Sequence, residues 1–163
     1  MKKSICLLLT LGVVAALVPV GMAASKKPAP LLEGITEYAL VAPPYGPLMV
    51  DGGGRVLVWE GTISGDIEGV IQWWIGPVTR TGSVSHYDDR CVILDEDENV
   101  LLEVLESGST TYRDGKDPIW RTNGVVTYAS GDYTDWIGRQ SHADGDAKLL
   151  ETPPCGTGTF RVN

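Results

Sequence analysis

The chain has 163 residues, of which 43% are hydrophobic and 21% are charged. This length corresponds to one domain, and the composition excludes both a disordered chain and a bundle of membrane helices. All 21 acidic residues follow position 24, whereas two of the 13 basic residues precede it, so residues 25–163 carry 11 basic side chains and a net charge of −10. Such a surface repels phosphate groups, and we expect no nucleic-acid partner.

Residues 1–24 have the pattern of a signal peptide. Two lysines at the start are followed by an apolar stretch from Cys6 to Val20, and small residues at Ala23 and Ala24 suit cleavage. The apolar stretch is shorter than the ~20 residues that a membrane-spanning helix needs. We therefore predict a secreted or periplasmic protein that is not stably inserted in a membrane after cleavage. An uncleaved anchor is the alternative.

Residues 25–54 have the composition of a linker. They contain five prolines and end in the run Gly52-Gly53-Gly54. Proline removes backbone donors and glycine weakens regular structure, so few ladder hydrogen bonds are expected. We predict a Pro/Gly-rich linker with at most a short extended piece around Ile35 to Val41.

Residues 55–163 show the two-residue period of β-strands, interrupted by Gly, Asp and Pro turns. Eight short strands are predicted, at 56–63, 69–75, 83–94, 100–112, 119–128, 136–142, 147–151 and 156–162. The pair Asp144-Gly145 is typical of a hairpin, and no helix is predicted. Regular short strands in one domain favour a sandwich or a barrel. Because closure removes exposed strand edges, we predict an all-β fold, a small antiparallel β-barrel of about eight strands.

Part of this domain resembles a known family. The stretch TNGVVTYASGDYTDWIG at 122–138 is similar to the glycine-punctuated strands of allene oxide cyclase-like and dirigent-like barrels, and the segment EGTISGD at 60–66 is compatible with them. The resemblance implies an eight-stranded antiparallel barrel, often oligomeric, with a pocket that runs into its lumen. Family members include cyclases and proteins that direct stereochemistry. No stretch matches a catalytic motif closely enough to transfer a residue.

Aromatic residues are the candidate ligand-binding groups. Strand parity places Trp59 with Ile63, Trp73 with Ile71, and Trp120 with Tyr128. Such rings supply large apolar surfaces for packing or for holding a ligand. We expect an apolar wall in the lumen, and core packing is the alternative for each ring. The candidates are Trp59, Trp73, Trp120 and Tyr128.

Two cysteines remain once the signal peptide is removed, Cys91 and Cys155. In an exported protein such a pair most often forms a disulfide, which we predict here. A redox function is the alternative, but the spacing is not that of a C-x-x-C motif.

Two carboxylates are candidates for acid–base chemistry, because Glu103 shares parity with Leu101 and Leu105, and Glu60 with Val58. If either faces the lumen, desolvation raises its pKa and suits it to act as a general acid or base. On the exterior, each is a solvated charge.

The turn that contains Asp95, Asp97 and Asn99 has the spacing of the first ligands of a calcium loop. Val100 occupies the position where that loop needs glycine, and no flanking helices are predicted. We therefore expect a solvated hairpin turn, with calcium as the alternative. No motif for another metal or for a cofactor is present.

These patterns predict a secreted small β-barrel that binds a small apolar molecule or serves as an interaction module. The alternative is an enzyme of cyclase or isomerase type that confines a hydrophobic substrate in the lumen. Residues 100–105 are apolar on both faces, which favours a homo-oligomer. An outer-membrane barrel is disfavoured, because the strands are mostly short and acidic residues occur in many of them.

Overall fold

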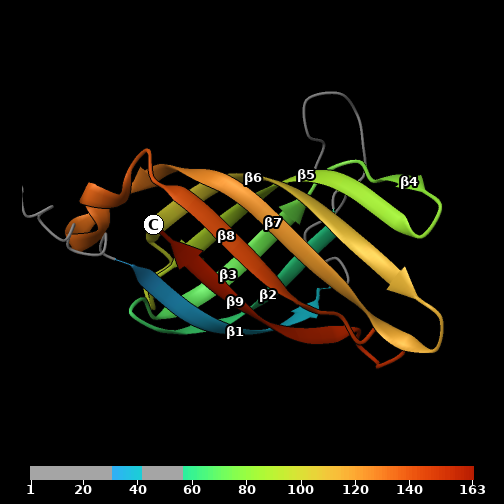
Figure 1. Ribbon diagram of the computed structural model, residues 1–163. Helices are drawn as coiled ribbons and strands as arrows, with labels where there is room; N and C mark the ends of the chain where they lie inside the picture. The colour runs from blue at the N-terminus through green and yellow to red at the C-terminus, as the bar shows by residue number, and fades with distance from the viewer. Residues whose placement is uncertain (1–30, 42–56) are drawn as a thin grey trace, which may run out of the picture.

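The computed structural model describes residues 31–41 and 57–163, most of which form antiparallel β-sheet (Figure 1). The predicted signal peptide at 1–24 lies outside the described residues, as do parts of the predicted linker. The elements in chain order are β1 (Leu32–Leu40), β2 (Leu57–Gly65), β3 (Gly69–Ile75), β4 (Thr79–Thr81), β5 (Val84–Leu94), β6 (Val100–Arg113), β7 (Lys116–Ala129), the 3-10 helix η1 (Gly131–Trp136), β8 (Gln140–Asp146) and β9 (Cys155–Val162).

Eight of the strands close into a barrel. Hydrogen-bonded neighbours follow the order β3-β2-β1-β9-β8-β7-β6-β5, and a further pairing of β3 with β5 completes the ring. The short strand β4 pairs only with β5. The prediction of an all-β fold and a closed eight-stranded antiparallel barrel is confirmed.

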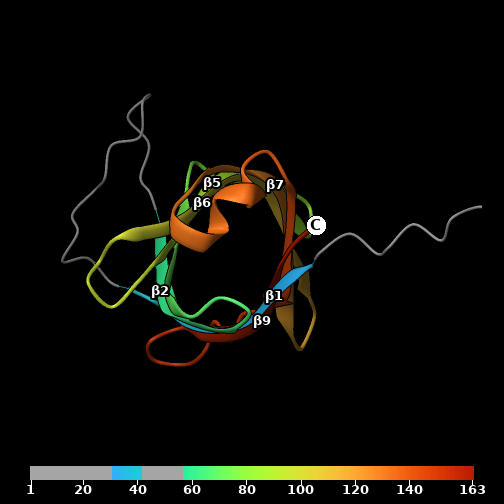
Figure 2. The same cartoon turned by 90° about the vertical axis from the view of Figure 1, so that its left-hand side faces the viewer.

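One end of the barrel is filled with apolar side chains. The large side chains in this part of the interior are completely buried: Ile67, Ile71, Ile93, Leu102 and Phe160. The helix η1 lies across this end, as Figure 2 shows, and its Tyr133 and Trp136 pack against the core. The interior at this end is therefore a packed core and not a channel.

The barrel begins earlier than the sequence indicated, because β1 lies inside the segment assigned to the linker. This strand pairs with β2 along one edge and with β9 along the other. Its Leu32, Thr36 and Tyr38 are buried in the interior. The proline content of 25–54 obscured this strand, although the prolines themselves all lie outside Leu32–Leu40.

The segment after β7 also differs from the prediction. Gly131–Trp136 forms η1, and the next strand begins at Gln140, not at Trp136. The expected hairpin pair Asp144-Gly145 lies within β8. A Cβ atom at Gly145 would lie 2.3 Å from the Thr157 carbonyl oxygen and 2.8 Å from the Trp120 ring. Glycine is therefore required here by a close approach of the next strand and a ring, and not by a turn.

Candidate functional site

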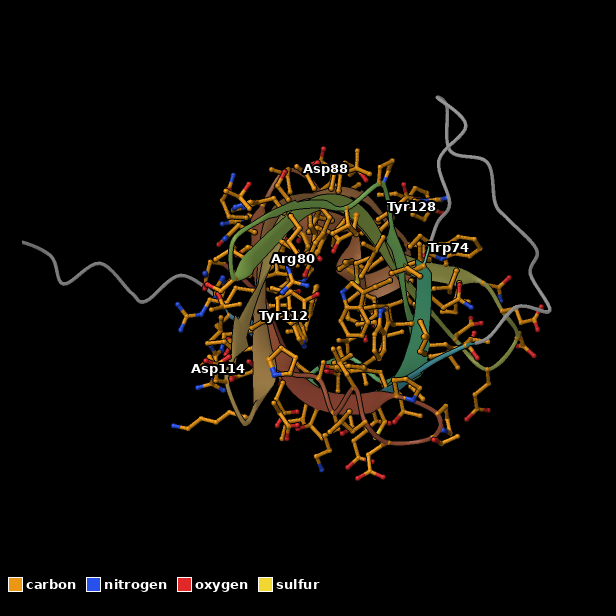
Figure 3. All side chains as sticks on the ribbon, turned by 90° about the vertical axis from the view of Figure 1, so that its right-hand side faces the viewer. Trp74, Arg80, Asp88, Tyr112, Asp114 and Tyr128 are labelled. Carbon is orange, nitrogen blue, oxygen red and sulfur yellow. The ribbon has the colours of Figure 1, made fainter. Side chains whose placement is uncertain are left out.

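The end of the barrel opposite η1 contains a pocket with a volume of about 300 Å³. Figure 3 views this end, where Tyr112 and Arg80 lie at the opening. Leu57, Val78 and Leu149 form part of the rim, and each is more than 40% exposed. The remaining lining residues are Tyr38, Leu40, Trp59, Trp73, Ile75, Ser85, Tyr87, Asp89, Thr110, Tyr112, Trp120, Thr122, Ala147 and Pro154.

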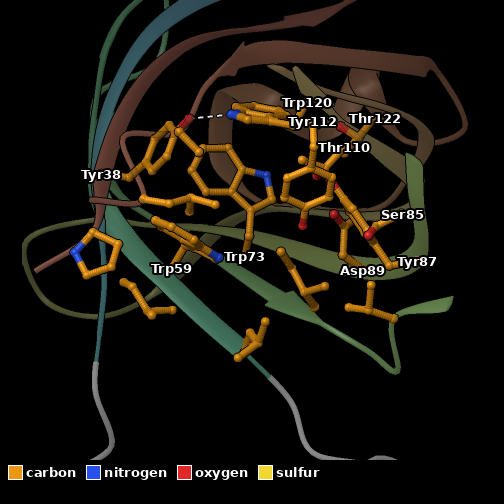
Figure 4. Close-up of a pocket in the computed structure, with 17 residues that line it drawn as sticks. Tyr38, Trp59, Trp73, Ser85, Tyr87, Asp89, Thr110, Tyr112, Trp120 and Thr122 are labelled. Carbon is orange, nitrogen blue, oxygen red and sulfur yellow. Dashed lines mark hydrogen bonds between the residues drawn. The ribbon is translucent and has the colours of Figure 1, made fainter. Parts of the chain in front are cut away.

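Four aromatic rings from different strands form one cluster in the pocket (Figure 4). The ring of Tyr38 contacts those of Trp59, Trp73 and Trp120 edge to face, with centroids 5.3–5.8 Å apart. Trp73 and Trp120 are also in contact, at 5.7 Å. Edge-to-face pairs of this kind add stability beyond the area they bury. Three of the four aromatic side chains proposed from the sequence therefore meet here.

Tyr38 is fixed at the centre of this cluster by hydrogen bonds. The Trp120 indole N–H donates to the Tyr38 hydroxyl, and the hydroxyl donates to the carbonyl of Asp146. Burial raises the pKa of Tyr38 far above its usual value. The hydroxyl therefore stays protonated and acts as a neutral link between β1, β7 and β8.

The fourth aromatic candidate, Tyr128, lies outside the pocket. Glu103 pairs with Tyr128 and Val104 with Val126, so Thr127 is an extra residue in β7. This bulge reverses the parity of the strand, and Tyr128 is 47% exposed on the exterior. The assignment of Tyr128 to the ligand wall is wrong for this reason.

The two candidate carboxylates also lie on the outer face. Arg90 donates to Glu103 with a nitrogen–oxygen distance of 2.6 Å, and the Gln72 amide donates to Glu60 at 2.7 Å. Neither residue lines the pocket. Neither carboxylate can therefore act on a molecule held in the lumen.

Two other carboxyl groups occupy the interior, those of Asp89 on β5 and Glu106 on β6. They are direct partners across the β5–β6 ladder. Asp89 is 7% exposed and lines the pocket, and Glu106 is 3% exposed. The barrel therefore contains a buried pair of acids beside its aromatic cluster.

Burial is the largest cause of the shifts in these two groups. It raises the pKa of Asp89 to about 8, and the neighbouring carboxyl of Glu106 adds to the shift. Burial raises the pKa of Glu106 to about 7, although Thr122, Ser141 and Trp73 oppose the shift. Two acids so close together cannot both ionise easily, so the pair retains a proton near neutral pH.

Several polar atoms of this region have no hydrogen-bond partner. They are both carboxyl oxygens of Asp89, Oε2 of Glu106, the indole nitrogen of Trp73 and the hydroxyl of Thr122. The other Glu106 oxygen accepts a bond from Ser141 at 3.1 Å. Trp73 and Thr122 lie near enough to lower the pKa of Glu106, but neither reaches it at hydrogen-bond geometry. Unpartnered buried polar atoms are costly, so such a group calls for water or a ligand.

The sequence contained a signal for this pair that was missed. Asp89 shares parity with Tyr87 and Cys91, and Glu106 with Leu102 and Val104, which are the inward residues of β5 and β6. Because 100–105 is apolar on both faces, parity alone did not show which face was internal. The wrong choice of face led to the proposal of Glu103, and not Glu106, as a candidate acid or base.

The predicted disulfide is absent, and Cys91 and Cys155 are both free thiols. Cys91 is in β5 and Cys155 in β9, and four strand-to-strand steps separate these strands in either direction around the barrel. They lie on opposite sides of the ring, whereas a disulfide needs Cα atoms within roughly 7 Å. Burial also raises the pKa of the Cys91 thiol well above its usual value.

In the acidic turn between β5 and β6, the carboxylate of Asp95 accepts hydrogen bonds from other residues of the same turn. Asp95 Oδ1 accepts bonds from the backbone N–H groups of Asp97 and Asn99, at 2.9 and 2.8 Å. The Asn99 amide also donates to the Asp95 carboxylate, and these bonds lower the pKa of Asp95. Among the residues with a described placement, no three His, Cys, Asp or Glu side chains gather to hold a metal ion. The geometry is that of a hydrogen-bonded hairpin turn.

The chain matches no family model, no curated protein and no solved structure. Fold and site therefore define its class, a closed antiparallel β-barrel with an aromatic pocket at one end. The similarity to allene oxide cyclase-like and dirigent-like barrels stays an expectation. In the described part of the chain, no helix has both the length and the apolar character that membrane crossing requires.

Proposed function

We propose that the protein is an exported barrel that binds a small apolar molecule in the pocket at its open end. The observation that carries this proposal is the uneven filling of the lumen. The η1 end is packed solid, whereas the other end leaves about 300 Å³ among aromatic and aliphatic side chains. Concave, largely apolar sites of about this size are typical of small-molecule binding.

The rim supports the same proposal. Leu57, Val78 and Leu149 expose apolar surface around the opening. A ligand seated in the pocket would bury part of this surface, at about 25 cal/mol for each Å² removed from water. An interaction module is the alternative within this proposal, in which another protein covers the rim.

A second candidate function is an enzyme of cyclase or isomerase type. The buried pair Asp89 and Glu106 favours it, because their pKa values of about 8 and about 7 lie close to neutral pH. A group with such a pKa can both accept and return a proton efficiently. Asp89 lines the pocket, so it lies nearer to a bound molecule than Glu106 does.

Native mass spectrometry of the protein purified from an exporting host tests the binding proposal. We expect a retained apolar compound, or uptake of one from a lipophilic library, at one molecule per barrel. Conversion of such a compound to an isomer would favour the enzyme; because the mass is unchanged, chromatography must detect the product. A mass without any adduct, together with no uptake from the library, would contradict both functions and leave the interaction module.

A further inference from the structure

The walls of the pocket differ in chemistry. The β1, β2 and β3 side carries aliphatic and aromatic groups, including Leu40, Trp59 and Ile75. The β5, β6 and β7 side carries Ser85, Asp89, Thr110 and Thr122, which face the cavity in Figure 4. A molecule that fits this pocket therefore has an apolar body and one polar end.

The carboxyl oxygens on the polar side of the pocket lack hydrogen-bond donors. Three carboxyl oxygens of Asp89 and Glu106 have no partner. The nearby free donors, Thr122 and Trp73, lie close to Glu106, whereas no described donor reaches Asp89. A proton shared between the two acids therefore still leaves one Asp89 oxygen without a donor. The ligand's polar end should therefore donate hydrogen bonds and not only accept them.

The ionisable groups that line the pocket favour a positive ligand over a negative one. None of the described residues that line it is basic. At the opening, Arg80 stacks on the Tyr112 ring at 4.4 Å and donates to the Gly82 carbonyl. The carboxyl oxygens are shielded from bulk water, which strengthens their attraction for a cation. Aromatic rings add a further attraction for ammonium groups.

We propose that the pocket takes an apolar amine in its ammonium form, with the ammonium group at the Asp89 end and the apolar body among the rings of Trp59, Trp73 and Trp120. This inference rests on the proposed binding function and specifies the chemistry of its ligand. An apolar carboxylate would place a third carboxyl group beside the buried Asp89–Glu106 pair, where burial disfavours its charge. An apolar alcohol could donate one hydrogen bond but would bring no charge.

Three probes of the same shape separate these cases: 2-naphthylmethylamine, 2-naphthylmethanol and 2-naphthoic acid. Titration calorimetry at neutral pH should show the amine binding at least tenfold more tightly than the alcohol, and the acid not measurably. If the alcohol or the acid binds as tightly as the amine, the inference is wrong while the binding function stands. If none of the three binds, both are contradicted.

Matched variants locate the effect. Asp89→Asn should bring the affinity for the amine down to that for the alcohol, and Asp88→Asn should leave the preference unchanged. Asp88 is the adjacent carboxylate on the outer face, where it accepts a bond from Ser107 at 2.7 Å. Circular dichroism establishes that each variant is folded, and Glu106→Gln serves as a second variant if Asp89→Asn is not. An amine preference that survives in the folded Asp89 or Glu106 variant would overturn the assignment.

Discussion

Asp89 and Glu106 face each other across neighbouring strands inside the barrel, and both are more than 90% buried. A buried acid next to apolar rings usually reduces stability, and two side by side reduce it further. Such a pair beside an open pocket is a candidate functional site on physical grounds. It also makes the stability of the fold dependent on pH.

Stability should fall as pH rises from about 5 to about 8. Both carboxyl groups have pKa values raised in the folded state, to about 8 and about 7, so the folded protein holds protons that the unfolded chain has released. The stabilisation that these protons give the folded state is complete below pH ~4, and it is lost as pH rises through the folded pKa values. The melting temperature should decrease by roughly 5 °C or more over this range, as measured by calorimetry.

The variant that carries both Asp89→Asn and Glu106→Gln is the control. It removes the two titrating groups but keeps the size of each side chain. Its melting temperature should change with pH much less than that of the wild type, leaving only the repulsion among surface acids. An equal pH dependence in both proteins would show that the pair does not titrate as described.

The sequence predicted the architecture better than the individual strands. The count of eight was correct because two errors cancelled. The segment of β1 was predicted as at most a short extended piece outside the barrel, and a strand was predicted at 147–151, where only Lys148 makes an isolated bridge with Cys155. Alternation identified most of the strands because one face of each is buried. It could not show that prolines flank β1 without entering it, or that Gly145 serves close packing and not a turn.

Gly61 should be among the positions of the barrel that tolerate substitution least. A Cβ atom there would lie 1.8 Å from the Glu37 carbonyl oxygen and 2.5 Å from the Tyr38 Cα, so the β1 backbone would have to shift. Gly61→Ala should lower the free energy of unfolding by about 2 kcal/mol, measured by urea denaturation.

Gly82→Asn is the matched control for this substitution. Gly82 has a φ of 62°, and a Cβ atom there would have no neighbour within 4 Å. Asparagine tolerates this backbone conformation better than most residues do. The free energy of unfolding should therefore stay within about 0.5 kcal/mol of the wild-type value. A similar loss in both variants would argue against the close contact of β1 and β2.

The two thiols should be unpaired with each other, even in protein from an oxidising compartment. Without reductant, a thiol reagent should modify Cys155 in the folded state and Cys91 only after unfolding, because Cys91 is completely buried. Peptide mapping by mass spectrometry reports both sites. A peptide linked through Cys91 and Cys155 would contradict the strand order, because β5 and β9 lie on opposite sides of the barrel.

Trp59→Ala should weaken ligand binding, because Trp59 lines the pocket. It should destabilise the fold less than the loss of a fully buried ring, because Trp59 is only partly buried, and the variant is used where circular dichroism shows it folded. We expect at least a tenfold loss of affinity for whichever naphthyl probe binds the wild type, measured by calorimetry. Trp74→Ala is the control, because Trp74 lies on the outer face of the neighbouring strand (Figure 3). An equal loss in both variants would place the binding site elsewhere.

The sequence predicted the aromatic part of the site and missed its acidic part. Trp59, Trp73 and Trp120 could be placed inside because their neighbours of equal parity are apolar. A bulge of one residue moved Tyr128 to the exterior, and no local sequence pattern predicts this bulge. Asp89 and Glu106 share parity with the inward residues of their strands, but they were missed because 100–105 is apolar on both faces and the wrong face of that strand was considered internal.

The central claim is that the open end of the barrel binds a small apolar molecule. The five indole N–H signals in a ¹⁵N-correlated NMR spectrum test it most directly, because three of the tryptophans line the pocket and two do not. Titration with the naphthyl probes should shift the signals of Trp59, Trp73 and Trp120 and leave those of Trp74 and Trp136 in place. Unchanged signals at saturating probe, or shifts confined to Trp74 and Trp136, would contradict the claim.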